Sequence, residues 1–132
     1  MEIPEHIRQV IGFLESQGLS RKAMVEGNGF GSGVITYENG VRVRIVNDRG
    51  DWFIEVSDLR QPNEWYDMAL LRHLLGDSGP DVLGVPEQAA ILTSRWEAIC
   101  RVFEPACAAE SHRRLQRLRE ERAKRWFPTW YK

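Results

Sequence analysis

Residues 33–57 read GVITYENGVRVRIVNDRGDWFIEVS, in which three alternating apolar runs are separated by two turn signals. Alternation with a period of two residues indicates strands with one buried face. The dipeptide Asn39-Gly40 and the tetrapeptide Asp48-Arg49-Gly50-Asp51 are typical of hairpin turns. This stretch predicts an antiparallel meander of three strands, at about 33–37, 41–47 and 52–57.

The register of the first hairpin follows from the requirement that both strands keep their apolar residues on one face. A two-residue turn would separate these residues onto opposite faces. A three-residue loop over 38–40, with its glycine in a left-handed conformation, keeps them together and pairs Tyr37 with Val41. Ile35 then faces Val43. We therefore expect a turn followed by a glycine bulge.

The same requirement selects a four-residue loop over 48–51 for the second hairpin, which pairs Ile45 with Ile54 and Val43 with Val56. The core face of the meander is then predicted to hold Ile35, Tyr37, Val41, Val43, Ile45, Trp52, Ile54 and Val56. The other face is predicted to be half-solvated and to carry Arg42, Arg44, Glu55 and Ser57, with one apolar spot formed by Val46 and Phe53.

Helical periodicity predicts four helices, at about 4–17, 63–75, 86–103 and 106–125. Gly18 is placed to end the first helix, and Asn63 to cap the second. Leu74 and Trp96 are expected to face the sheet. The order of elements predicts an α+β fold, with an N-terminal helix, a three-stranded antiparallel meander and three C-terminal helices packed on one face of the sheet. We expect a single domain over residues 1–132, with an arginine-rich helix and an aromatic tail from about residue 106.

Composition excludes several classes of protein. The 132 residues are 42% hydrophobic and 28% charged, which suffices for a buried core and argues against disorder. No apolar run approaches the roughly 18 residues that a membrane span needs. The amino terminus has no secretory signal pattern. We therefore expect a cytoplasmic chain without membrane contact.

The formal net charge of −1 conceals an asymmetry. Residues 112–132 contain eight basic and two acidic residues, a net charge of +6, so residues 1–111 carry a net charge of −7. A basic segment beside an acidic body can neutralise that body internally, form a solvated helix face, or bind a partner of opposite charge.

The sequence offers no constellation for catalysis or metal binding. The glycine-rich run over 27–33 precedes a strand, whereas a phosphate-binding loop opens a helix, so we interpret it as a lead-in to the sheet. Cys100, Cys107 and His112 lack a fourth metal ligand and the usual short spacing. Both cysteines are therefore expected to be small buried residues. We predict a protein that is not an enzyme and has no cofactor or metal.

Asp67 falls among the leucines of its predicted helix, and two interpretations are open. Burial could raise its pKa and make it an acid or base. Alternatively, the dipole and free amides of the first helical turn stabilise it as an anion. We favour the second interpretation.

Two candidate binding surfaces remain. Acidic groups beside large aromatic residues suit contact with a basic protein, and we predict a protein-binding surface formed by Asp48, Asp51, Trp52, Asp58, Glu64, Trp65 and Asp67. The alternative is a nucleic-acid site, in which arginines contact the backbone and an aromatic ring stacks on bases, formed by Arg113, Arg114, Arg117, Arg125 and Trp130.

The run YENGVRVRIVNDRGDWFIEVSD, followed by EWYDMALLRHLLG, resembles small bacterial proteins of the toxin-immunity kind. These proteins combine a short antiparallel sheet, carrying a D-R-G-x-W turn, with a helix of the pattern W-Y/F-D-x-x-x-L-R-x-L-L. The likeness covers about residues 37–76. It implies a cytosolic inhibitor that binds and blocks a toxin domain, often a nuclease, through an acidic surface. The basic carboxy-terminal helix departs from that pattern.

Overall fold

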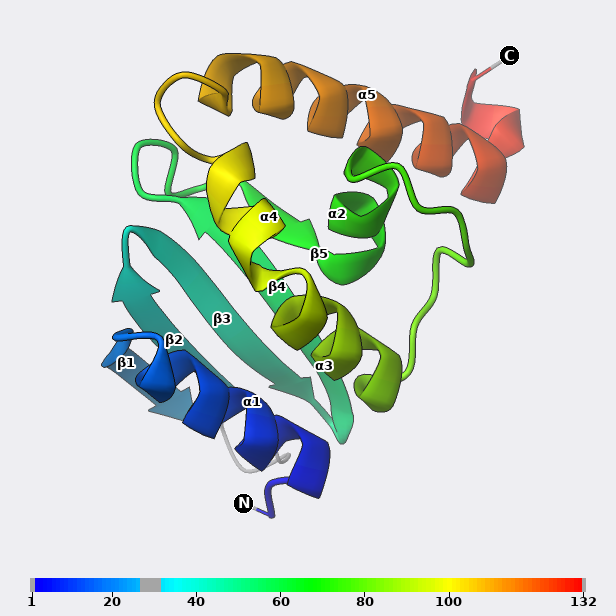
Figure 1. Cartoon of the computed structure of the whole chain (residues 1–132). Coiled ribbons are helices and arrows are strands. Elements are labelled where there is room, and N and C mark those ends of the chain that lie inside the picture. Colours follow the sequence, from blue (N-terminus) through cyan, green and yellow to red (C-terminus); the bar gives the residue numbers. More distant parts are fainter. Residues whose placement is uncertain (1, 27–31, 132) are drawn as a thin grey trace.

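The computed structural model describes residues 2–26 and 32–131 (Figure 1). Within these residues the chain forms a five-stranded sheet, five α-helices and a short 3-10 helix. In chain order the elements are α1 (Glu5–Ser16), β1 (Ser20–Glu26), β2 (Gly33–Asn39), β3 (Val41–Asp48), β4 (Asp51–Asp58), β5 (Trp65–Asp67), α2 (Met68–Leu74), α3 (Val85–Ser94), α4 (Trp96–Val102), α5 (Ala108–Trp126) and η1 (Pro128–Tyr131). The predicted α+β class is confirmed, while most of the glycine-rich run, residues 27–31, lies outside the described residues.

The sheet is an antiparallel meander in the order β1-β2-β3-β4-β5. The prediction of three strands was incomplete, because it omitted both edge strands. All seven residues of β1 are exposed, so no buried, alternating apolar face marks this strand in the sequence. β5 has three residues, which pair with Glu55–Ser57 of β4 and are too few to give a periodic signal.

The β2–β3 hairpin differs from its predicted register by two residues. Tyr37 lies opposite Val43, and Ile35 lies opposite Ile45. A shift of two leaves every side chain on its predicted face, because side chains of a strand alternate with a period of two. Gly40 lies at the tip with φ +77°, so the predicted left-handed glycine is confirmed.

The predicted β3–β4 register is confirmed, with Ile45 opposite Ile54. The loop is shorter than predicted, because the two aspartates that flank it pair with each other. Arg49 and Gly50 alone form the turn, with φ values of 55° and 92°. Two successive residues of positive φ match the twist of the flanking strands in a tight hairpin.

Helices cover one face of the sheet (Figure 1). α1 and α3 lie side by side, α4 continues from the end of α3, and α2 and α5 lie together near β5. Their apolar sides and the predicted core face of β2–β4 form one buried cluster. Leu74 and Trp96 belong to it, with 6% and 8% exposure, as predicted.

In the described chain four α-helices and the short η1 follow the sheet, where three helices were predicted. The predicted helix over 86–103 is divided at Arg95 into α3 and α4. Just before the division, the hydroxyls of Thr93 and Ser94 donate hydrogen bonds to the carbonyls one turn earlier, at 3.0 and 2.6 Å. Side chains that bond back to the helix in this way often bend it.

The start of α2 also differs from the prediction. Asn63 does not cap it, because the chain from Trp65 to Asp67 is drawn into the sheet as β5. The helix begins at Met68, and Asp67 is its cap. Pairing with β4 therefore overrides the local signal for a helix start at Asn63.

The outer face of the sheet, turned away from α1, α3 and α4, stays partly exposed. On this face an apolar row crosses the four strands β1 to β4. Each strand contributes one residue, which lies directly opposite that of the neighbouring strand: Val25, Val34, Val46 and Phe53. The neighbouring row contains the Arg44–Glu55 ion pair, at 2.7 Å. Phe53 ends the apolar row and is 44% exposed.

Candidate functional site

α5 is held against the body of the protein by three arginines spaced three residues apart, which therefore share one side of the helix. Each meets a carboxylate of the body, in the ion pairs Arg119–Glu64 (3.0 Å), Arg122–Asp67 (2.7 Å) and Arg125–Asp81 (3.0 Å). Arg119 also donates to the backbone carbonyl of Trp65. Part of the basic segment thus neutralises the acidic body internally, which is one of the arrangements that the charge asymmetry allowed.

Asp67 belongs to this set and has a second partner. Its carboxylate accepts a hydrogen bond from the backbone N–H of Leu70, at 3.0 Å, and so caps α2. The same carboxylate receives two nitrogens of the Arg122 guanidinium, at 2.7 and 3.1 Å. This fork geometry gives strong, charge-assisted hydrogen bonds. The surroundings of Asp67 are those of an anion stabilised at a helix start, the interpretation favoured from the sequence.

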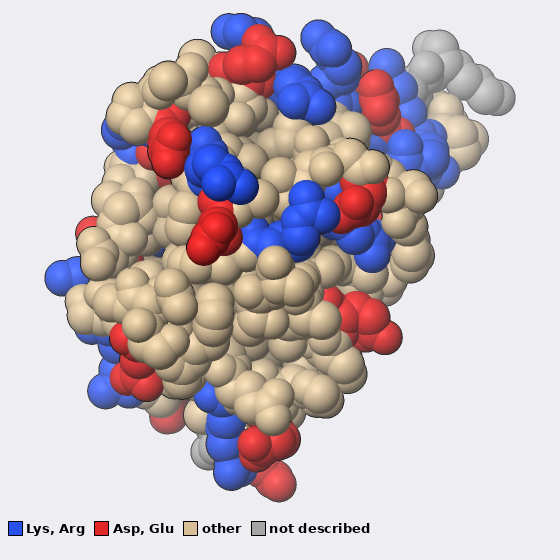
Figure 2. All heavy atoms as spheres, in the orientation of Figure 1, with Lys and Arg blue, Asp and Glu red and all other residues tan. Residues whose placement is uncertain are grey.

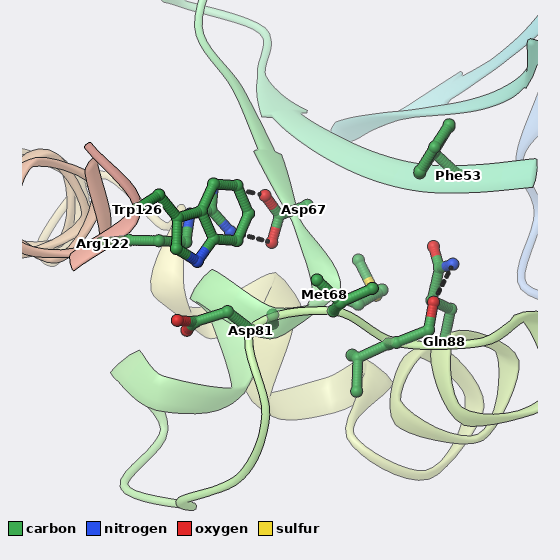
Figure 3. A pocket seen from close by; sticks show the side chains of 10 residues that line it. Phe53, Asp67, Met68, Asp81, Gln88, Arg122 and Trp126 are labelled. Carbon is green, nitrogen blue, oxygen red and sulfur yellow. Dashed lines mark hydrogen bonds and ion pairs between the residues drawn. The ribbon is translucent and has the colours of Figure 1, made fainter. Parts of the chain in front are cut away.

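A pocket opens beside this ion pair (Figure 3). Its walls come from β4, the start of α2, the α2–α3 connection, α3 and the end of α5. They include Phe53, Met68, Val82, Leu83, Gln88 and Trp126. Figure 3 shows Trp126 beside the Asp67–Arg122 pair and Phe53 projecting from β4 at the other side. We call this site the Phe53–Trp126 pocket. Its volume is about 200 Å³, whereas small-molecule sites usually enclose roughly 300–1,000 Å³.

The polar groups of the pocket already have partners. The side-chain oxygen of Gln88 accepts from Ile54 N–H at 2.9 Å, and its nitrogen donates to the carbonyls of Trp52 and Leu83 at 3.0 and 3.1 Å. Arg122 binds Asp67, and its guanidinium lies over the Trp126 ring, 5.0 Å from the ring centroid. This distance is within the roughly 6 Å of a cation–π contact. The pocket therefore offers mainly apolar surface to an occupant.

The rim of the pocket exposes large apolar side chains. Phe53, Val82 and Trp126 are 44%, 77% and 47% exposed. Single apolar residues are common on protein surfaces, but clusters of them around a hollow mark interaction sites. These three residues come from β4, the α2–α3 connection and α5, so the cluster exists only in the folded chain.

The tip of the β3–β4 hairpin adds negative charge next to Phe53. Asp48 lies directly opposite Asp51, and both are exposed. Like charges at directly opposed positions of a sheet are unfavourable, and within residues 2–26 and 32–131 neither carboxylate has an ion-pair partner. The Val46–Phe53 pair follows next along the same face. An acidic and an apolar pair therefore adjoin each other.

A separate polar cluster is buried between β4, β5 and α5. His112 Nε2 lies 3.2 Å from the Asp58 carboxylate, and its Nδ1 lies 2.7 Å from the Tyr66 hydroxyl. With Nε2 donating to the carboxylate, Nδ1 accepts from the hydroxyl. Burial by itself would raise the pKa of Asp58, but hydrogen bonds from Arg60 and His112 outweigh it and lower that pKa. The cluster joins α5 to the sheet.

The predicted acidic and aromatic surface is not continuous in the structure. Trp52 and Asp58 are buried, with 6% and 3% exposure, so neither can contact a partner. Glu64 and Asp67 are bound by the arginines of α5, and Trp65 lies under the guanidinium groups of Arg42 and Arg44. Of the seven predicted residues, the exposed carboxylates without an ion-pair partner in the described chain are Asp48 and Asp51.

The alternative nucleic-acid residues are also divided. Arg113, Arg114 and Arg117 are exposed on α5, whereas Arg125 binds Asp81. Trp130 lies in η1, but its side chain is outside the described part of the structure. The outward side of α5 also carries acidic residues, as in the ion pairs Arg113–Glu110 and Lys124–Glu120. Figure 2 accordingly shows basic and acidic side chains intermixed over the α5 end of the visible face.

The cysteines fit their predicted surroundings only in part. Cys100 is half-buried, and burial raises its pKa to about 11, which keeps it a thiol at neutral pH. Cys107 is exposed, contrary to the prediction, because it lies at the cap position that begins α5. Among residues 2–26 and 32–131, no three His, Cys, Asp or Glu side chains cluster closely enough to hold a metal ion.

Reasoning from the sequence missed the Phe53–Trp126 pocket. Phe53 carried a signal, because it is apolar on a face whose other predicted residues are mostly charged. Val82 and Trp126 carried none, since each lies in an irregular or terminal segment where no periodicity indicates a face. They reach Phe53 through the tertiary fold alone.

Comparisons with models of known protein families, with curated proteins and with solved structures found no match. In the described part of the chain, no helix combines the length and apolar character that crossing a membrane requires.

Proposed function

We propose that this chain is a non-catalytic protein-binding domain whose contact surface consists of Asp48, Asp51, Val46 and the Phe53–Trp126 pocket. The observation that carries the proposal is the cluster of exposed Phe53, Val82 and Trp126 around a hollow with an apolar lining. A few residues contribute most of the binding energy of a protein interface, and tryptophan is enriched among them. We name this set the hairpin–pocket surface.

The size and chemistry of the pocket indicate what it would accept. Its volume of about 200 Å³ suits one bulky apolar side chain, and its polar groups are already bonded within the protein. A projecting leucine, methionine or aromatic residue of a partner would bury apolar surface there, worth roughly 1.5–3 kcal/mol for a fully buried side chain. The occupant is thus a protein segment.

The charge beside the pocket favours a basic partner. Asp48 and Asp51 repel each other across the hairpin, and a lysine or arginine placed between them would relieve that repulsion. Such complementarity accelerates association and excludes acidic partners. Together with the resemblance over residues 37–76, this charge makes an immunity-like inhibitor of a basic toxin domain the particular role that we propose.

Site-specific photo-crosslinking in the native host tests this proposal. A photoreactive phenylalanine analogue replaces Phe53 or Trp126, and replaces Gln9, exposed on α1, as the matched control. We expect the analogue at positions 53 and 126 to crosslink the same basic protein, and the analogue at position 9 not to crosslink it. That protein should arrest growth when produced alone and should not when produced with this chain. Equal capture at all three positions would contradict the binding surface, and capture of a harmless protein would contradict the immunity role.

Nucleic-acid binding is a second candidate, favoured by the exposed Arg113, Arg114 and Arg117 on α5. A protein that follows a nucleic-acid backbone needs a stripe of positive charge. Here Glu110 and Glu120 interrupt the same side of the helix through their ion pairs with Arg113 and Lys124. We therefore rank this function below protein binding.

A further inference from the structure

The two edges of the sheet differ in how they are protected. Along β5, α5 closes the edge, where Arg119 donates to the Trp65 carbonyl and stacks on Tyr66. At the other edge, β1 pairs with β2, and no further strand pairs with it among residues 2–26 and 32–131. An unprotected edge strand presents backbone groups that can pair with another strand. β1 is therefore the edge that is open to a further strand.

β1 exposes apolar side chains on both faces of the sheet. Met24 lies opposite Ile35 and so points toward the helix side, yet it is 45% exposed. Val25 lies opposite Val34 on the outer face and is 62% exposed. The strand thus leaves apolar surface uncovered where the sheet ends, on the side of the helices as well as on the outer face.

The charges of β1 are ordered along the strand. Arg21 and Lys22 stand near its start, and Glu26 stands at its end. Within the described residues neither Lys22 nor Glu26 has an ion-pair partner. An antiparallel copy of the same strand would place the basic start of one chain opposite the acidic end of the other. The strand is therefore complementary in charge to itself.

We propose that β1 pairs with β1 of a second copy of this chain, in antiparallel orientation about a two-fold axis at Met24. In this register Lys22 of each copy faces Glu26 of the other, and Ala23 faces Val25. Ala23 and Val25 both belong to the outer face, because they lie opposite Thr36 and Val34. The two sheets join into one continuous sheet whose helices share a side, and the exposed Met24 side chains meet at the axis.

A bulge in β1 limits the length over which the two copies can pair. A register shift between Arg21 and Ala23 leaves Lys22 without a direct partner on β2. Bulges of this kind limit how far an edge strand can pair. The regular part of the strand, Ala23–Glu26, spans the proposed axis, and the long Lys22 side chain reaches beyond it. The contact is therefore short and depends on its charges.

Charge reversal tests the proposal on the full chain. The wild-type protein should give a mass near twice 15.3 kDa in light scattering at high concentration, and high salt should lower that mass. Lys22→Glu and Glu26→Lys each place like charges opposite each other at both ends of the contact. We expect each variant to raise the dimer dissociation constant by about tenfold or more.

Combining the two charge reversals distinguishes a loss of β1 pairing from a loss of folding. The double variant Lys22→Glu/Glu26→Lys should dimerise again, and an equimolar mixture of the two single variants should form a heterodimer. Arg114→Glu, which reverses an exposed charge on α5, is the matched control and should leave the mass unchanged. Circular dichroism checks that every variant is folded. A monomeric wild-type protein would overturn the proposal, and so would single variants that dimerise as tightly as the wild type.

Discussion

The Arg122 guanidinium lies 2.7 Å from the Asp67 carboxylate, and this contact joins α5 to the cap of α2. The two residues are 55 positions apart in the chain. One carboxylate thereby begins a helix, fixes the last long helix against the body and forms one side of the Phe53–Trp126 pocket. Its two contributions to stability can be separated by substitution.

Asp67→Asn should destabilise the protein less than Asp67→Ala. Asparagine is a good helix cap but cannot form the ion pair, whereas alanine loses both interactions. Loss of the cap costs about 0.5–2 kcal/mol, and this difference should separate the two variants in urea unfolding. Equal losses would show that the cap contributes nothing, and would leave the Arg122 contact as the sole role of the side chain.

The buried Asp58 should make the protein sensitive to acid. Its pKa is lowered in the folded state, so its stabilisation is present above the unfolded pKa of about 4 and is lost as the pH falls through the folded value. Asp58→Asn should be less stable at pH 7, because Arg60 and His112 lose their charged partner. Its stability should also fall less steeply with acid. Parallel pH profiles for variant and wild type would contradict this role.

Gly40 and Gly12 should respond oppositely to larger side chains. Gly40 has φ +77°, so Gly40→Val should cost more than about 1 kcal/mol through backbone strain. Gly12 is exposed within α1 and has open space around it, so Gly12→Ala should stabilise by about 0.5–1 kcal/mol. Thermal unfolding measures both, and a Gly40→Val variant as stable as the wild type would refute the turn geometry.

The exposed arginines of α5 provide a test of the nucleic-acid alternative. We expect a fluorescent single-stranded oligonucleotide to bind weakly or not at all at low salt. The variant Arg113→Ser/Arg114→Ser/Arg117→Ser should then behave like the wild type. Tight binding that disappears in this variant and falls steeply with salt would indicate phosphate contacts. That outcome would place nucleic-acid binding above protein binding.

The β3–β4 register was predicted correctly and the β2–β3 register was not, although the apolar pattern is equally ambiguous in the two hairpins. A shift of two residues preserves the faces of a strand, so pairing Ile35 with Val43 or with Ile45 satisfies the apolar pattern equally well. In β3 and β4 the predicted turn, centred on Arg49 and Gly50, selects the register in which Ile45 lies opposite Ile54. The faces followed from the pattern, but the exact partners in β2–β3 did not.

The edge strands and the pocket depend on contacts that no local pattern contains. β1 is exposed along its length, and β5 forms because Trp65–Asp67 pair with β4 in place of extending α2. Asp58 was expected at the surface because it is charged and ends a strand. Trp52 was predicted both on the core face and on the binding surface, and its 6% exposure confirms the core face. In the fold, His112 and Arg60 surround Asp58, while Gln88 covers the Trp52 backbone. These partners lie far along the chain, except for Arg60.

The affinity of the captured partner for Phe53→Ala, compared with Leu59→Ala, tests the proposed binding surface most directly. Both side chains are apolar and partly exposed, at 44% and 38%, but Leu59 does not line the Phe53–Trp126 pocket. We predict that Phe53→Ala raises the dissociation constant by about tenfold or more, as expected of an interface hot spot, and that Leu59→Ala leaves it nearly unchanged. Equal effects of the two substitutions, or no effect of Phe53→Ala, would contradict binding through this pocket.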